Sequence, residues 1–265
     1  MGTLVCFHAH PDDESIATGG TIARAVSEGH RVVLVVATDG DHGEVPADLN
    51  PGESLADRRR RETAESAEVL GISEVVWLGY KDSGMTGWEQ NHDPESFLQA
   101  ETESAALLLA DVLRREQAEV LTIYDWHGGY GHPDHIKVHH VGIRAAELAG
   151  TSEVFEATMN RDAMRRGLEM ARELGVDFGE DDFDPDGPAD DGNPMGLTEA
   201  ELTHGVDVSA FVEQKRASLR CHRSQITDTA MFSAIPDEYF LIAFGTEWYR
   251  KRGTKGPVRD GWLFE

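Results

Sequence analysis

Short, continuous apolar runs alternate with longer segments of helical periodicity along the first two-thirds of the chain. The clearest run is residues 31–37 (RVVLVVA), which is β-branched, unbroken and too short for a buried helix. Unbroken apolar strands are typical of parallel sheets that are covered on both faces. Strands that alternate with helices at this spacing predict a doubly wound, Rossmann-like α/β fold, with a mostly parallel sheet and helices on both faces.

The expected elements follow this alternation. We expect strands at residues 4–7, 31–37, 74–78, 120–124 and 154–158. We expect helices at residues 15–28, 55–70, 94–116, 133–149 and 161–174. Gly29, Gly71 and Gly150 directly follow three of these helices, as is common for C-caps. In a sheet of this kind ligands bind beyond the carboxyl ends of the strands, which predicts where the chemistry should lie.

The chain of 265 residues is expected to form a single domain with a smaller C-terminal elaboration. Residues 1–175 would be the Rossmann-like catalytic core, and residues 176–265 an acidic loop and an elaboration packed on that core. Residues 176–194 are rich in Asp, Gly and Pro and predict a loop. From residue 197 onward we expect a short strand, a helix near 209–220 and an apolar segment at 239–244.

The charge balance excludes some partners. The sequence has 24 basic and 49 acidic residues, a formal net charge of −25. Such a surface repels phosphate backbones and anionic lipid headgroups, so we expect no nucleic-acid partner and no membrane partner. The start of the chain lacks the basic and apolar pattern of a signal peptide, which favours a cytoplasmic protein. The two cysteines, Cys6 and Cys221, cannot form a disulfide framework. The sequence leaves open whether the protein forms a homo-oligomer.

A dense group of metal-type ligands follows the first expected strand. Residues 8–14 (HAHPDDE) hold two imidazoles and three carboxylates within seven residues. Imidazole nitrogen and carboxylate oxygen are ligands of catalytic zinc. His10 and Asp13 are three positions apart and can converge in a tight turn, which Pro11 would stiffen. Asp12 would then point elsewhere, free to act as a base.

A second group follows the fourth strand, at residues 130–135 (YGHPDH). Strands one and four are neighbours at the switch point of a doubly wound sheet, so both groups should face one crevice, with His135 as a third ligand. Three protein ligands leave a position open for water, which is the catalytic arrangement. Polar helix caps would explain one His-Pro-Asp unit, but two at neighbouring strand ends favour a metal site.

Both motifs together resemble those of the PIG-L/LmbE-like family of zinc-dependent de-N-acetylases. Residues 128–135 (GGYGHPDH) and 78–85 (LGYKDSGM) are further similar to the branch of that family that acts in mycothiol metabolism. The resemblance covers about residues 3–150 well and the C-terminal third loosely. It implies the fold expected above, and one Zn²⁺ per chain.

The resemblance also implies residue roles. The positions that match the zinc ligands are His10, Asp13 and His135. Asp12 matches the general base that deprotonates a zinc-bound water. His132 matches a histidine that stabilises the oxyanion or protonates the leaving amine, Asp134 could hold His132 in place, and Tyr130 matches a tyrosine that can swing over the substrate carbonyl. The substrate-binding positions, which would hold the sugar or its inositol or line the pocket, are Arg59, Asp82 and Glu44.

The function implied is removal of an N-acetyl group from an N-acetylglucosamine-type small molecule, such as N-acetylglucosaminyl inositol. One alternative is an amidase that cleaves S-conjugates of mycothiol, or a deacylase of another small amide. Such amidases tend to carry a lysine shortly after the first motif, where this chain has Ala17, which favours the deacetylase. A non-catalytic metal-binding protein is a remote alternative. Such a protein would be expected to lose Asp12 or His132, and this chain has both.

Two further segments carry weaker signals. Residues 182–193 match the first half of a calcium-binding loop, but the twelfth position is Asn193 and two prolines intervene, so a solvated acidic loop is favoured over a second site for Ca²⁺. His222, Ser224 and Gln225 follow an expected helix and resemble a family segment near the pocket; a structural cap explains them equally well.

Overall fold

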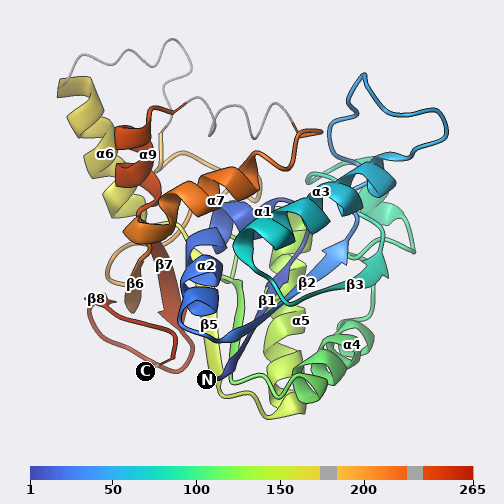
Figure 1. The fold of residues 1–265 in the computed structure, drawn as a ribbon, viewed down its shortest axis with the longest axis horizontal. Helices are drawn as coiled ribbons and strands as arrows, with labels where there is room; N and C mark the ends of the chain where they lie inside the picture. Colours follow the sequence, from blue (N-terminus) through green and yellow to red (C-terminus); the bar gives the residue numbers. More distant parts are fainter. Residues whose placement is uncertain (174–183, 226–234, 265) are drawn as a thin grey trace.

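The computed structural model describes residues 1–173, 184–225 and 235–264 (Figure 1). Its strands are β1 (Thr3–His8), β2 (Arg31–Thr38), β3 (Glu74–Tyr80), β4 (Val120–Tyr124), β5 (Glu153–Thr158), β6 (His204–Asp207), β7 (Thr246–Lys251) and β8 (Arg259–Asp260). Its helices are α1 (Asp13–Ala17), α2 (Gly19–Ser27), α3 (Leu55–Leu70), α4 (Thr102–Arg115), α5 (Pro133–Ala149), α6 (Arg161–Glu173), α7 (Val212–Leu219) and α9 (Asp237–Phe244). Short 3₁₀ turns occupy Glu89–His92 and Ser209–Phe211.

The strands form one eight-stranded sheet in the order β3-β2-β1-β4-β5-β7-β6-β8. The first five in this order run parallel, whereas β7 is antiparallel to both β5 and β6. The chain winds outward from β1 in both directions, so the switch point lies between β1 and β4. The expected doubly wound, mostly parallel α/β fold is confirmed, and the C-terminal third extends the same sheet.

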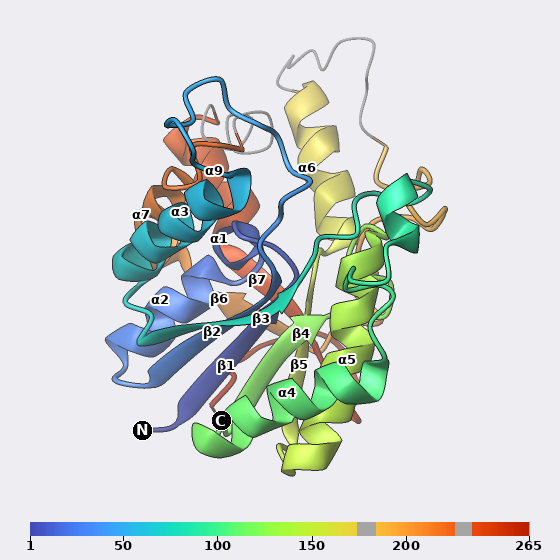
Figure 2. The ribbon, with the colours of Figure 1, turned by 90° about the vertical axis from the view of Figure 1, so that its right-hand side faces the viewer.

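Each face of the sheet is covered by helices, as Figure 2 shows with α4 and α5 on one side and α2, α3 and α7 on the other. Alternate residues of β1 supply the two cores. Val5 and Phe7 pack into the cluster that includes α4 and α5, and Leu4 and Cys6 pack into the cluster that includes α2. Both faces of β1 are buried, which is why its sequence is continuously apolar.

The helix expected at residues 15–28 is interrupted. The chain leaves helical geometry at Thr18, so α1 and α2 are separate. A long-range contact causes the break: the carboxylate of Glu247 in β7 accepts hydrogen bonds from the amides of Gly20 and Thr21 at 2.8 Å each. A carboxylate at this position satisfies amides that open a helix. A side chain at Gly20 would meet Val208 at 2.6 Å, so a glycine is required there.

The helix expected at residues 94–116 starts later, at Thr102. The residues before it cover the sheet instead. Phe97 is fully buried, its amide donates to the carbonyl of Lys81 at 2.9 Å, and its ring meets Phe7 edge-on at 6.3 Å. Burial of this aromatic ring outweighs the helical start that Pro94 would favour.

The C-terminal third contains elements that the sequence did not indicate. Strands β7 and β8 were not expected, whereas the short strand expected between residue 197 and the helix near 209–220 corresponds to β6. The expected helix at 209–220 is a 3₁₀ turn followed by α7, and the apolar segment at 239–244 lies in α9. Part of the expected loop, residues 176–183, lies outside the described residues; residues 184–194 contain no helix or strand.

Helix α7 packs against α1, α2 and α3. None of the described helices is long and apolar enough to cross a membrane.

Candidate metal centre and active site

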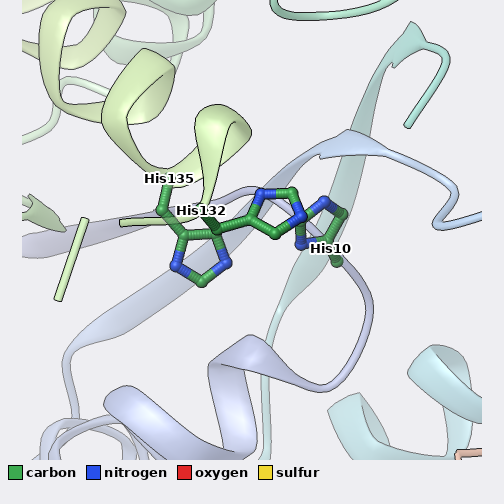
Figure 3. A group of neighbouring side chains, drawn as sticks. All are labelled: His10, His132 and His135. Atoms are coloured by element: carbon green, nitrogen blue, oxygen red, sulfur yellow. The ribbon is translucent and has the colours of Figure 1, made fainter. Parts of the chain in front are cut away.

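The two His-Pro-Asp motifs meet at the carboxyl edge of the sheet. His10 lies in the turn after β1, and His132 and His135 lie at the start of α5 after β4, as Figure 3 shows. Ring centroids are 4.6 Å apart for His10 and His132 and 5.2 Å apart for His132 and His135. All three side chains are buried. The parallel pairing of β1 with β4 brings these distant motifs into one cluster.

The predicted ligand atoms face one another. His135 Nδ1 lies 3.2 Å from the carbonyl of Gly128 and so carries the proton, which leaves a lone pair on Nε2. That Nε2 atom is buried, has no hydrogen-bond partner among the described residues, and lies 3.4 Å from Asp13 Oδ1. His10 Nε2 donates to Asp134 Oδ2 at 3.2 Å, so Nδ1, which lies 3.5 Å from Asp13 Oδ2, is the His10 nitrogen left to bind a metal. A buried lone pair that faces a carboxylate is suited to a metal ion.

The electrostatics of the cluster favour a cation. Burial disfavours charge on His10, but the carboxylates of Asp82, Asp13 and Asp134 outweigh it and raise the pKa of His10 well above its usual value. Burial likewise disfavours charge on Asp13, but His135 and His10 hold the pKa of Asp13 well below its usual range. The cluster therefore stabilises positive charge, as a metal site does.

Other donor sets lie in the same cluster. One ligand atom each of His10, His132 and His135 lie within 4.8 Å of one another, and so do those of His10, Asp82 and Asp134. In the second set the two carboxylates contact Nε2 of His10, at 3.5 Å for Asp82 and 3.2 Å for Asp134. These contacts indicate that Asp82 and Asp134 orient His10 from the ring edge opposite Nδ1.

Asp12 is held in an unusual conformation beside the ligands. Its φ of 92° lies in the left-handed region, and its side chain is buried. Its amide donates to Glu14 Oε2 at 3.0 Å, and its Oδ2 accepts from Arg59 Nη2 at 3.2 Å. Burial raises the pKa of Asp12 to about 6, with Arg59 acting against that rise and Asp13 adding to it. A carboxylate with this pKa can take up and release a proton near neutral pH.

Arg59 is buried against the turn that carries Asp12. Its guanidinium donates to the carbonyl of Gly40 at 2.7 Å and to the carbonyl of Pro11 at 2.6 Å, besides its contact with Asp12. The guanidinium thus ties the loop after β2 to the loop after β1. The sugar contact implied by the family resemblance stays a prediction.

His132 and Asp134 interact through the backbone. The amide of Asp134 donates to His132 Nδ1 at 3.1 Å, whereas the Asp134 carboxylate bonds to the amide and hydroxyl of Ser83 and to His10. Because His132 Nδ1 accepts, its Nε2 carries the proton. Burial, followed by the rings of His10 and His135, lowers the pKa of His132, so the ring is neutral and Nε2 is a donor.

The remaining predicted residues differ in placement. Tyr130 is half-buried, and its ring meets that of His135 at 4.9 Å. Asp82 is buried and accepts a hydrogen bond from the amide of Gly84 at 2.8 Å. The side chain of Glu44 is exposed, so the structure does not bring it into the buried cluster.

Two supporting residues were missed from the sequence. Tyr124, the last residue of β4, stacks on His135 with centroids 4.3 Å apart, and its hydroxyl bonds to His8 Nδ1 at 2.8 Å. Ser83 holds the Asp134 carboxylate. Their positions at strand ends beside the motifs were the available signal.

The acidic loop carries internal contacts of its own. Asp182 and Phe183 lie outside the described residues. Within the described part, Asp186 Oδ2 accepts from Arg165 Nε at 2.6 Å, and Asp184 Oδ1 accepts from the amide of Asp186 at 2.9 Å. A calcium ion at residues 182–193 stays an untested prediction.

Fold and site together define a doubly wound α/β protein with a buried His/Asp centre at the carboxyl edge of its sheet. Residues 5–146 match the PIG-L family, described as GlcNAc-PI de-N-acetylase, and the chain belongs to this family.

Two relatives that are similar over most of their length carry the same name. The chain is 37% identical to the 1D-myo-inositol 2-acetamido-2-deoxy-alpha-D-glucopyranoside deacetylase of Acidothermus cellulolyticus, over 98% of this chain and 92% of that protein. It is 43% identical to the protein of the same name from Saccharomonospora viridis, over 91% of this chain and 95% of that protein. Its fold is similar to that of an N,N'-diacetylchitobiose deacetylase from Pyrococcus horikoshii, with a TM-score of 0.57, 24% identity, and coverage of 94% of this chain and 83% of that one.

Proposed function

We propose that this protein is a zinc-dependent hydrolase that removes the acetyl group from N-acetylglucosaminyl inositol, releasing acetate and a free amine. The observation that carries the proposal is the buried His135 Nε2, which has no hydrogen-bond partner in the described part of the chain and faces the Asp13 carboxylate, with His10 Nδ1 near the same carboxylate. The names of the full-length relatives support the substrate. They favour a deacetylase over a conjugate amidase.

His10, Asp13 and His135 would hold the metal, and a mixed His/Asp donor set suits zinc. Zinc in such a site supplies Lewis-acid polarisation of the amide carbonyl and acidifies a water molecule. Asp134 contacts His10 at Nε2, and the Gly128 carbonyl contacts His135 at Nδ1. These contacts leave His10 Nδ1 and His135 Nε2, which face the Asp13 carboxylate, as the nitrogens that would bind the metal.

Proton transfer is assigned to two residues. Asp12 accepts the proton of the attacking water, because burial brings its pKa to about 6. His132 presents its Nε2 hydrogen, either to the developing oxyanion or to the departing nitrogen. Tyr130, whose ring contacts His135, would cover the substrate carbonyl. A non-catalytic metal protein would have no need of Asp12 in this geometry.

Substrate contacts are proposed for the rim of the cluster. Asp82 is fixed beside His10, and its carboxylate can accept hydrogen bonds from the hydroxyl groups of a sugar. The net charge of −25 favours a neutral substrate over a phosphorylated one. Glu44, whose side chain is exposed, would contact the more distant part of the substrate.

Acetate release tests the proposal. Chelated and zinc-restored protein would be compared on N-acetylglucosaminyl inositol, on simple N-acetylglucosaminides and on a mycothiol S-conjugate. Zinc-dependent release of acetate from the inositol glycoside, faster than turnover of the others, is expected. Preferential cleavage of the S-conjugate would replace the deacetylase with the amidase, and no turnover by protein with bound zinc would refute hydrolysis of these amides.

A further inference from the structure

The carboxylate of Glu14 connects the Asp12 turn to the C-terminal third of the chain. Its Oε2 accepts from the amide of Asp12 at 3.0 Å, and its Oε1 accepts from His222 Nε2 at 2.7 Å and from the hydroxyls of Ser15 at 3.0 Å and Ser66 at 2.5 Å. Glu14 and His222 are both fully buried. His222 lies just beyond α7, far from Glu14 in sequence. A charge-assisted hydrogen bond in such a dry environment is strong and directional.

The position of Asp12 depends on that carboxylate. Asp12 adopts φ of 92°, a conformation that costs an L-residue free energy and persists where its surroundings hold it. Glu14 fixes the amide and Arg59 fixes the carboxylate, while the Asp12 carbonyl accepts from the amides of Ser15 and Ile16 at 2.9 and 3.2 Å. If Glu14 rotated, the Asp12 amide would lose its acceptor, and the direction of the Asp12 carboxylate would be expected to shift.

We propose that His222 is a positioning residue for the hydrolysis: by holding Glu14, it fixes the backbone of Asp12 and so the aim of the Asp12 carboxylate. This inference rests on the proposed role of Asp12 as the base. It assigns to the C-terminal elaboration a direct influence on the reaction. His222 lies outside residues 5–146, the part of the chain that matches the family.

A purely structural role would be attachment of the segment 221–225, but other contacts attach it. Ser224 donates to Glu62 of α3 from its amide at 3.0 Å and from its hydroxyl at 2.6 Å. Arg223 pairs with Glu65 of α3 at 2.6 Å. The segment is therefore expected to stay docked on α3 when the His222 ring is replaced.

Gln225, in the same segment, contacts the loop that carries Glu44. Its Oε1 accepts from the amide of Glu44 and its Nε2 donates to the carbonyl of Glu44, both at 3.0 Å. This residue holds the loop after β2 rather than the Asp12 turn. Its loss is thus expected to alter KM, whereas loss of His222 is expected to alter kcat.

The test compares His222→Leu, which removes the donor, with His222→Gln, whose amide nitrogen can occupy the place of Nε2. Arg223→Ala is the matched control in the same segment. For His222→Leu we expect kcat on N-acetylglucosaminyl inositol to fall about ten- to hundredfold through misplacement of Asp12. KM and zinc content should be unchanged, His222→Gln should recover most of the loss, and Arg223→Ala should match the parent protein.

Hydrogen exchange of peptides spanning residues 10–17 gives a readout that needs no activity. Faster exchange there in His222→Leu, but not in Arg223→Ala, is expected because the Asp12 amide loses its fixed acceptor. Unchanged kcat, or a change in KM alone, would overturn the inference. If His222→Leu does not fold, His222→Asn, too short to reach Glu14, replaces it, and equal kcat for the Asn and Gln variants would overturn the inference. Should the parent protein hydrolyse no substrate, the proposed function fails, and unaltered exchange would separately reject the link to Asp12.

Discussion

His10 Nε2 lies 3.2 Å from Asp134 Oδ2, on the opposite side of the imidazole from Asp13. The Asp134 carboxylate therefore orients the ring of a predicted metal ligand, while only the Asp134 amide reaches His132. The family resemblance suggested a link between Asp134 and His132. The geometry gives the carboxylate a different partner.

Asp134→Ala is accordingly expected to weaken zinc binding by about ten- to hundredfold, the usual effect of losing a carboxylate behind a ligating histidine. Competition with a fluorescent chelator measures this affinity. Ser83→Ala, which keeps the Ser83 amide bond to Asp134, is the control and should bind zinc nearly as well as the parent. Parent-like zinc affinity in Asp134→Ala, together with lost activity, would instead place Asp134 with His132.

Asp12→Ala should retain zinc and lose about 10²- to 10⁴-fold in kcat, because general-base assistance is removed while the proposed ligands remain. Elemental analysis of the purified protein and acetate release give the two quantities. His10→Ala is the contrasting variant and should lose the metal itself. Full activity in Asp12→Ala, or unchanged zinc in His10→Ala, would contradict the assignments.

Tyr124 supports His135 through its ring and His8 through its hydroxyl. Tyr124→Phe should keep zinc affinity and lower the free energy of unfolding by about 1–3 kcal/mol, since a buried partner of His8 is lost. Tyr124→Leu removes the stacked ring as well and should also weaken zinc binding. Urea titration and chelator competition separate the two effects. Equal zinc affinity in both variants would show that stacking does not position His135.

Lys215 and Glu247 form a buried ion pair at 2.6 Å, with side chains 1% and 3% exposed. Lys215→Met should lower the free energy of unfolding by about 3–5 kcal/mol, because it leaves the Glu247 carboxylate buried without its cation. Urea unfolding measures the change. The double variant with Glu247→Gln should recover part of the loss. A single variant as stable as the parent would mean that water or the α2 amides compensate the charge.

The sequence predicted the centre of this molecule well because its signals there are local. Five parallel strands follow from unbroken apolar runs, and the winding rule alone places β1 beside β4. Residues 8–14 and 130–135 could then be brought together before any coordinates were known. Their ring orientations could not, because these depend on contacts such as the Gly128 carbonyl and the Ser83–Asp134 bond.

Failures arose where distant residues decide local structure. No window around Thr18 reveals that Glu247 will cap a new helix at Gly20. Strand β7 was itself hidden, because Glu247 is a charged residue at a buried position, which breaks the apolar pattern of a strand. Arg59 was expected to bind the substrate because of the family resemblance alone, and only the fold places its guanidinium against the carbonyls of Pro11 and Gly40.

The cap on α2 also has a consequence for the order in which the protein is made. Ribosomes release the amides of Gly20 and Thr21 early, but the carboxylate that satisfies them belongs to β7, near the end of the chain. Until Glu247 has been synthesised, the amides of Gly20 and Thr21 must bind water instead. Over the same period Lys215 lacks its carboxylate partner. A chain that ends before β7 would still contain both His-Pro-Asp motifs, but it would lack the carboxylate that caps α2.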